Sequence, residues 1–207
     1  MRKLYFLIII FSIRCFSQNF EGEIVYSNDY KSKSPQLKDE ILNSTMGTKQ
    51  EYFIKNGNYK SVTNGQFLIW QLYVNKNNKL YNKLINSEAL LWNDANIQGD
   101  EILSVLTNKN VITILGNNCD ELTLTCKSGV QKYYYSSKFS VDASKFINHK
   151  LGNWYDFVSR SNSLPLKTII ENTQFTLIST AVEIKPMKLD DNLFSLPKGI
   201  KTEKSPY

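Results

Sequence analysis

The sequence predicts a mainly β domain of the α+β class: a curved antiparallel sheet, or incomplete β-barrel, with a few helices plugging its concave side. Three observations support this prediction. Tyr and Phe are abundant, with 12 and 11 copies, and aromatic residues favour strands. Asn-Gly pairs, which favour tight hairpin turns, separate apolar runs at 56–57 and 64–65. The segments predict about ten antiparallel strands, and a sheet of that size must twist, curl or close.

The N-terminal residues 1–17 predict a signal peptide. A short basic start precedes the apolar run 4–13, which is too short for a bilayer span of about 20 apolar residues. We expect cleavage after Ser17, and export of the protein to the periplasm or the medium. The alternative is a lipoprotein acylated at Cys15. Arg14 argues against that alternative, because a lipid-attachment site favours a small residue in this place.

The remaining chain predicts one β domain over residues 18–200, followed by a C-terminal tail, 201–207. Cleavage of the signal peptide lowers the net charge from +6 to about +3, and leaves Arg160 as the one arginine. Arginine supplies the bidentate contacts of nucleic-acid recognition, so we expect no nucleic-acid partner. No second apolar run in the sequence reaches the length of a membrane span, so we expect no transmembrane segment in the mature chain.

The first elements follow from alternation and capping signals. The opening "FEGEIVY" alternates with period 2, with Ile24 and Tyr26 on one face, which predicts a half-buried strand. Ser34 suits a helix cap and Gly47 suits a helix exit, so a helix is predicted over 35–46 and is expected to lie against the sheet.

A meander of four strands is predicted next, because turn signals recur at 56–57, 64–65 and 75–78. The strand "FLIWQLYV", 67–74, is apolar on both faces. A strand with one face in water would alternate with polar residues. This strand must therefore be covered on both sides, by protein or by a ligand.

The second half of the chain predicts further strands, interrupted by two short helices. Residues 100–107 fit either a helix or a strand. Asp142 is a suitable cap for one short helix, a second helical turn is predicted at 153–160, and a hairpin turns at 172–173. Pro186 ends the last strand of that hairpin.

Aromatic and aliphatic residues of the sheet are the candidate ligand-binding residues. Sheet aromatics either line a lipophilic cavity or fill a dry core, and the dry core is the commoner arrangement. The strand 67–74 supplies most of the candidates because both of its faces are apolar. The candidates are Phe67, Ile69, Trp70, Leu72 and Tyr134.

Three parts of the sequence carry a resemblance to a known group: "FEGEIVY", "ILGNNC" with "YYYSS", and "LPLKTIIE" through "MKLDDNLFSLPKG". They resemble uncharacterised secreted proteins of gram-negative bacteria with the outer-membrane lipoprotein carrier (LolA/LolB-like) fold, and share features with the GLPGLI family. The resemblance implies an incomplete barrel closed by helices, whose cavity holds acyl chains in the carriers. "NSLPLKTII" stands in place of the GLPGLI signature, and Arg160 does not match the acyl-site arginine of the carriers. Only the fold and a cavity are therefore inferred.

No catalytic site, metal site or cofactor is predicted. His149 is the only histidine, whereas a multi-histidine metal site needs several, and no nucleophile or metalloprotease motif occurs. The adjacent Asp190 and Asp191 resemble an acid/base pair. Neighbouring residues of a strand point to opposite faces, so we expect Asp190 to cap a short turn instead.

Cys119 and Cys126 remain after cleavage, and an oxidising compartment permits a disulfide between them. On one extended strand their Cα atoms would lie roughly 23 Å apart, whereas a disulfide needs less than about 7 Å. A disulfide therefore requires a turn between the two residues, and the sequence leaves both outcomes open.

The sequence as a whole predicts a non-enzymatic binding protein, secreted or periplasmic, that holds a lipid or another hydrophobic ligand in the concave interior of its sheet. The alternative is an envelope protein–protein interaction module, with a filled core and no ligand.

Overall fold

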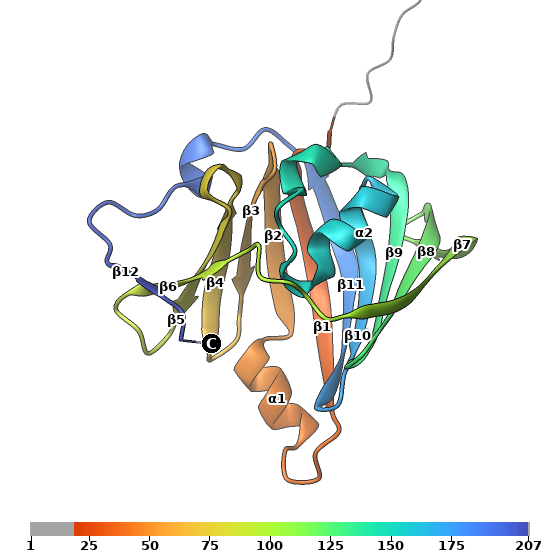
Figure 1. Cartoon of the computed structure of the whole chain (residues 1–207), viewed down its shortest axis with the longest axis horizontal. Helices are drawn as coiled ribbons and strands as arrows, with labels where there is room; N and C mark the ends of the chain where they lie inside the picture. The colour runs from red at the N-terminus through yellow and green to blue at the C-terminus, as the bar shows by residue number, and fades with distance from the viewer. Residues whose placement is uncertain (1–18, 207) are drawn as a thin grey trace, which may run out of the picture.

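The computed structural model describes residues 19–206, and the predicted signal peptide, 1–17, lies outside the described residues. The strands form one 12-stranded sheet in the order β12-β6-β5-β4-β3-β2-β1-β11-β10-β9-β8-β7. The sheet curls around a concave side without closing (Figure 1), which confirms the predicted incomplete barrel. The strands are β1 (Gly22–Ser32), β2 (Lys49–Lys55), β3 (Asn58–Thr63), β4 (Leu68–Val74), β5 (Lys79–Leu84), β6 (Leu90–Asp94), β7 (Ile102–Ile114), β8 (Asn117–Cys126), β9 (Gly129–Ser140), β10 (Ser163–Glu171), β11 (Phe175–Pro186) and β12 (Thr202–Lys204).

Strand pairing follows the predicted turns in the first half of the sheet. Asn56 and Gly57 have φ angles of 49° and 80°, as a tight two-residue hairpin requires, and they join β2 to β3. The neighbouring pairs are antiparallel, except that β12 runs parallel to β6. The prediction of a tail at 201–207 is therefore wrong for Thr202–Lys204, which extend the sheet beside β6.

Short helices cover the concave side, as predicted. These are η2 (Ala143–Phe146), η3 (Leu151–Asn153) and α2 (Trp154–Ser161), and they lie across the inner face of the sheet in Figure 1. The Asp142 side chain caps η2 by accepting a hydrogen bond from the Ser144 backbone N–H at 3.0 Å. The predicted short helix after Asp142 and the predicted helical turn at 153–160 are confirmed by η2 and α2.

The first helix differs from its prediction. α1 begins at Asp39 rather than at residue 35, and it ends at Met46. Of the apolar residues in the predicted range 35–46, Leu42 is buried, whereas Leu37 and Ile41 remain 36% and 52% exposed. In Figure 1, α1 lies at the end of β1, away from the interior of the sheet. The helix packs on β1 at this end, where Asn43 Nδ2 donates a hydrogen bond to the Tyr30 carbonyl at 2.8 Å.

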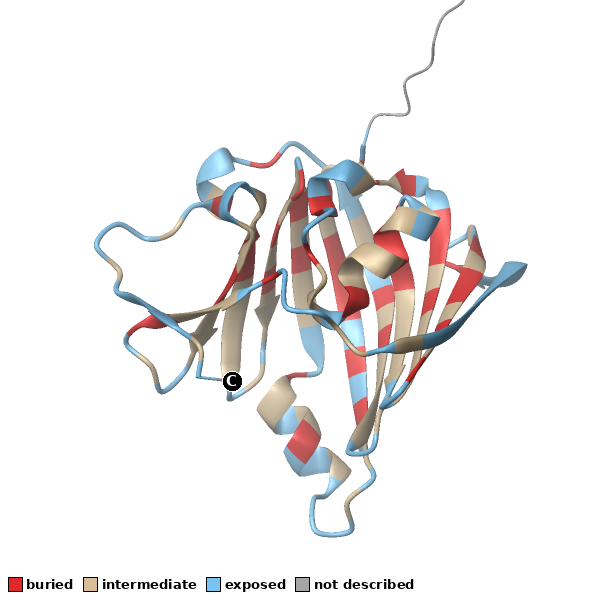
Figure 2. Ribbon diagram, in the orientation of Figure 1, coloured by how far each residue is buried: buried red, intermediate tan, exposed pale blue. Residues whose placement is uncertain are grey.

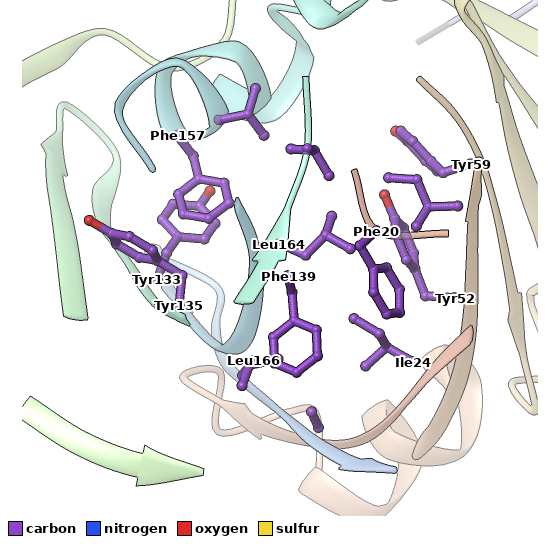
Figure 3. Packing of buried hydrophobic residues seen from close by; sticks show 14 of the residues in the cluster. Phe20, Ile24, Tyr52, Tyr59, Tyr133, Tyr135, Phe139, Phe157, Leu164 and Leu166 are labelled. Carbon is purple, nitrogen blue, oxygen red and sulfur yellow. The ribbon is translucent and has the colours of Figure 1, made fainter. Parts of the chain in front are cut away.

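The main core fills the end of the concave side nearest α2. Figure 2 shows buried residues in bands on the inner strands and on α2. Phe157 of α2 is fully buried and stacks on Tyr133 of β9, with ring centroids 4.3 Å apart. Figure 3 shows this ring above Tyr133 and Tyr135, with Leu164 and Leu166 beside them. Aromatic side chains therefore fill the concave side over this part of the sheet.

The segment 95–101 crosses the mouth of the concave side, because it connects β6 and β7 from distant positions in the strand order (Figure 1). Ala95 is fully buried, and its carbonyl accepts hydrogen bonds from the Lys150 and Leu151 N–H groups, at 2.7 and 3.0 Å. A Cβ atom on Gly99 would lie 1.9 Å from Asn153 Oδ1. The crossing segment therefore needs glycine at this position to pack against the η3 region.

A second, smaller core lies on the outer face of the sheet. It explains why the strand predicted at 67–74 is apolar on both faces: Tyr73 belongs to the main core, and Leu72 belongs to the outer cluster. The C-terminal segment after β11 supplies the cover, since Leu189 and Phe194 are buried against this cluster. Protein therefore covers both faces of β4 at Leu72 and Tyr73. The buried members of the outer cluster are Leu72, Tyr81, Leu90, Leu189 and Phe194.

The adjacent carboxylates after β11 have separate structural contacts. Asp190 caps η4 (Asp191–Phe194) by accepting a hydrogen bond from the Asn192 N–H at 2.8 Å. The Asp191 carboxylate forms an ion pair with Lys55 Nζ at 2.9 Å. Glu21 also lies near Lys55 and accepts a hydrogen bond from the Leu189 N–H at 2.7 Å. The predicted capping role of Asp190 is confirmed.

Replacing Asp190 by alanine should lower the free energy of unfolding by about 1 kcal/mol, because the η4 turn loses its cap. Asp190→Asn keeps an oxygen acceptor and should cost less. Asp191→Ala is the matched control, and because Asp191 is 88% exposed its ion pair contributes about 0–1 kcal/mol. Urea unfolding followed by circular dichroism measures all three variants. If Asp190→Ala and Asp190→Asn lower stability equally, the side-chain cap is not the cause.

Candidate ligand-binding site

A pocket of about 160 Å³ opens on the concave side, where Trp154 of α2 faces the inner surface of four strands. Its volume is below the roughly 300–1,000 Å³ of most small-molecule sites, but a cavity of about 150 Å³ holds one benzene ring. The pocket therefore suits a ring or a short acyl segment. Its wall consists of Tyr26, Gln50, Tyr52, Trp154, Pro165, Thr168, Leu177 and Ser179.

Strand register brings these residues together from distant parts of the sequence. In β1 and β2, Tyr26 pairs with Gln50, and in β10 and β11, Thr168 pairs with Ser179. The pairing of β1 with β11 joins the two halves of the wall. Residues that oppose each other in adjacent antiparallel strands share one face of the sheet. The register thus directs all four side chains inward.

Several buried polar atoms at the pocket have no hydrogen-bond partner among the described residues. They include the Tyr52 hydroxyl and Trp154 Nε1 of the wall, and Oδ1 of the neighbouring Asn28. Asn28 opposes the wall residue Ser179 across β1 and β11. The Tyr26 hydroxyl, in contrast, donates to the Pro165 carbonyl at 2.7 Å. Unpaired buried polar groups are costly, so a ligand that bonds to them gains affinity.

A row of neutral polar side chains continues from the pocket across the inner face of β2 to β6. Gln50 Nε2 donates to Ser61 Oγ at 2.8 Å, and Ser61 opposes Gln71 in the β3–β4 register. Gln71 Nε2 donates to Asn82 Oδ1 at 2.8 Å, and Asn82 Nδ2 donates to Asn93 Oδ1 at 3.1 Å. We call these five side chains the amide row. Ser61 is buried, and the other four are half-buried.

Neither the pocket wall nor the amide row contains an Asp, Glu, Lys or Arg side chain. The charged residues of β2 and β3 point outward instead, as Lys60 does by packing its Nζ 5.2 Å from the Trp70 ring centroid. The site therefore offers aromatic surface and uncharged hydrogen-bonding groups, but no counter-ion for a charged ligand.

His149 lies deeper in the main core and is 2% exposed. Its Nε2 shares a 2.7 Å hydrogen bond with the Tyr59 hydroxyl, and its ring lies 4.3 Å from the Tyr73 ring. Burial lowers the pKa of His149 to about 4, because desolvation disfavours the imidazolium. The ring is therefore neutral at physiological pH and packs as part of the core.

The structure separates the five candidates that the sequence analysis selected, and none of them belongs to the pocket wall. Trp70 and Leu72 pack in the outer core, and Tyr134 lies beneath Lys167 Nζ at 5.8 Å. Ile69 is half-buried in β4, and Phe67 precedes that strand and is 50% exposed. Their role in ligand binding remains a prediction.

Tyr52 and Trp154 of the pocket wall are not among the residues predicted from the sequence. Gln50, Tyr52 and Ile54 are spaced two residues apart along one strand, which indicates that they share a face of the sheet. Its proximity to Trp154 depends on how α2 returns over the sheet, and no local signal encodes that return.

The disulfide considered for Cys119 and Cys126 does not form, since both residues are free and buried in the structure. They lie on the same extended strand, β8, so the turn that a bridge requires is missing. Asn153 Nδ2 lies 3.4 Å from Cys126 Sγ. Burial raises the pKa of both thiols.

Within residues 19–206, no group of three or more His, Cys, Asp or Glu side chains is placed to hold a metal ion. None of the helices in the same range has the length and apolar character needed to cross a membrane.

The geometry defines a protein with an open, curled β-sheet and a concave pocket beneath a short helix. No family model and no curated protein sequence matches the chain. Among solved structures, it is similar to PNGF-II, with 17% identity and a TM-score of 0.49 over 90% of this chain.

That alignment spans 32% of the PNGF-II chain, so this protein corresponds to about a third of that structure. LprF from Mycobacterium bovis is 9% identical, with a TM-score of 0.34 over 82% of this chain and 88% of LprF. Both TM-scores lie below 0.5.

Proposed function

We propose that this is an exported, non-enzymatic binding protein that holds the hydrophobic part of a small ligand in the concave pocket. The observation that carries the proposal is the pocket wall itself, where Tyr26, Tyr52, Trp154 and Leu177 surround a space the size of one ring. The unpaired Tyr52 hydroxyl and Trp154 Nε1 add hydrogen-bonding groups for a ligand. Export follows from the sequence of residues 1–17, and the periplasm and the medium are both consistent with it.

Binding rather than catalysis is proposed because the wall contains no acid, base or activated nucleophile. The one histidine is engaged with Tyr59 in the core. Affinity in such a site comes from apolar area removed from water, at about 25 cal/mol per Å², and from pairing of the buried polar atoms.

Native mass spectrometry of delipidated protein tests this proposal, with mixtures of monoacylglycerols, fatty acids and phospholipids at micromolar concentration. We expect bound masses for the full chain, and their loss in Thr168→Trp, because the indole fills the pocket. Thr180→Trp is the matched control, because Thr180 follows the inward-facing Ser179 on the same strand, opposes Lys167 and so faces outward. Equal binding by both variants, or no bound mass at all, would contradict the proposal.

An envelope interaction module with a filled interior is the second candidate function, and strand β7 favours it. β7 pairs with β8 alone, at the edge of the sheet, and exposes Leu103, Val105 and Leu106. An exposed apolar edge strand can pair with an extended segment of another chain. If mass spectrometry finds no apolar ligand, this candidate gains over the first.

A further inference from the structure

The amide row extends the pocket into a two-part site, with an aromatic end and a neutral polar end. Gln50 belongs to both parts, because it lines the pocket and donates to Ser61. Adjacent strands lie about 4.8 Å apart, so the row covers roughly 19 Å from β2 to β6. A ligand whose apolar end occupies the pocket would place its other end on this row.

We propose that the ligand is a neutral amphipath with a polyhydroxylated, sugar-like head group, and that the amide row binds this head. The inference rests on the proposed function of the pocket. Its first support is the absence of charged side chains from the pocket wall and the amide row. A charged head group would lose hydration there without gaining a counter-ion, which is unfavourable.

The second support is the hydrogen-bonding character of the row. Each Asn or Gln amide provides two N–H donors and one carbonyl acceptor, and each hydroxyl group both donates and accepts. Gln71 uses Nε2 on Asn82, and its Oε1 accepts no hydrogen bond from the described residues. Several hydroxyl groups on one rigid ring match a repeated series of donors and acceptors, whereas an alkyl chain matches none of them.

The third support is a pair of unpaired polar atoms on residues of the pocket wall. The Tyr52 hydroxyl can donate or accept and Trp154 Nε1 can only donate, and both are buried without a protein partner. Tyr52 opposes Ser61 of the amide row across β2 and β3. Tyr52 therefore connects the pocket wall with the row, at the junction where the oxygen between an alkyl group and a sugar ring would lie.

Isothermal titration calorimetry of the full chain with four hexyl compounds tests the proposal. The probes are n-hexyl β-D-maltoside, n-hexyl β-D-glucoside, hexanoate and hexylammonium, which share the tail and differ in the head. We expect the glucoside to bind at least tenfold more tightly than either ion, and the maltoside to bind more tightly than the glucoside because it covers more of the row. If the ions bind as well as the glycosides, the head-group inference is wrong and the pocket function stands. If no probe binds, the proposed function itself fails.

Variants of Gln71 locate the head group. Gln71→Leu should weaken maltoside binding about tenfold, the factor expected for one lost pair of hydrogen bonds, and leave hexanoate binding unchanged. Gln71→Glu is nearly isosteric and should improve binding of hexylammonium relative to the maltoside. Gln174→Leu, at the exposed tip of the β10–β11 hairpin, is the matched control and should bind as the unmodified chain does. Circular dichroism confirms folding, and unchanged maltoside affinity in folded Gln71→Leu would overturn the assignment.

Discussion

Replacing Phe157 by alanine is expected to lower the free energy of unfolding by about 3–5 kcal/mol, the usual range for a buried aromatic residue. The side chain is fully buried. Its ring stacks on Tyr133 at 4.3 Å and meets the Tyr135 ring at 5.9 Å and the Trp154 ring at 5.7 Å. Alanine would leave a cavity between α2 and the inner face of the sheet. The lost free energy would come from the contact that holds α2 over the pocket.

Urea unfolding, followed by far-ultraviolet circular dichroism, measures this change. Phe67→Ala is the matched control, because Phe67 is 50% exposed and an exposed side chain contributes within about 0.5 kcal/mol. Phe157→Leu should recover part of the loss by filling most of the volume. Similar stabilities of Phe157→Ala and Phe67→Ala would show that α2 does not anchor the interior as described.

Acidification is expected to destabilise the protein through His149, by about 3 kcal/mol in total. The pKa of the imidazole is about 4 in the fold and about 6.5 in an unfolded chain. The unfolded chain therefore binds the proton more readily, so the stability contributed by neutral His149 is complete above pH ~6.5 and is lost as the pH falls towards ~4. The groups that face the ring are neutral: Tyr59, Tyr73 and Trp154.

The measurement compares the unfolding free energy of the unmodified chain and of His149→Phe, from pH 7 down to pH 4. Phenylalanine keeps the aromatic contacts and does not titrate. Both chains are also measured with Tyr59→Phe, which removes the hydroxyl that would otherwise lose its hydrogen-bond acceptor. We expect the chain with His149 to lose about 3 kcal/mol of unfolding free energy relative to His149→Phe as the pH falls. Parallel curves over this range would exclude His149 as the origin of acid sensitivity.

Local signals in the sequence predicted the elements well. The Asn56-Gly57 hairpin needs positive φ at both positions, and Asp142 and Asp190 cap short turns, so each of these features is encoded within a few residues. The prediction that both faces of the apolar strand at 67–74 are covered is confirmed at Leu72 and Tyr73. It did not show that Leu189 and Phe194 provide the outer cover, because that contact joins segments more than a hundred residues apart.

The predictions that were wrong also depend on contacts between segments far apart in the sequence. The helix at 35–46 has an apolar stripe, but Leu37 and Ile41 stay exposed because α1 packs at the end of β1 and not inside the sheet. Thr202–Lys204 resemble a polar tail, and their strand forms only because β6 has a free edge. The candidate ligand-binding residues were chosen from one strand. The pocket arises from the register of β1, β2, β10 and β11, which the sequence does not specify locally.

The central claim is that an apolar group binds between Trp154 and the inner face of the sheet, and quenching of Trp154 fluorescence tests it most directly. Trp70 and Trp92 pack in the outer core, so Trp70→Phe/Trp92→Phe leaves Trp154 as the single tryptophan. Titration of this variant with 6-bromohexanol should give saturable quenching, because the bromine enters the pocket beside the indole. Unquenched Trp154 fluorescence, with quenching instead in the reciprocal variant Trp154→Phe, would contradict the account and place the apolar site on the outer face.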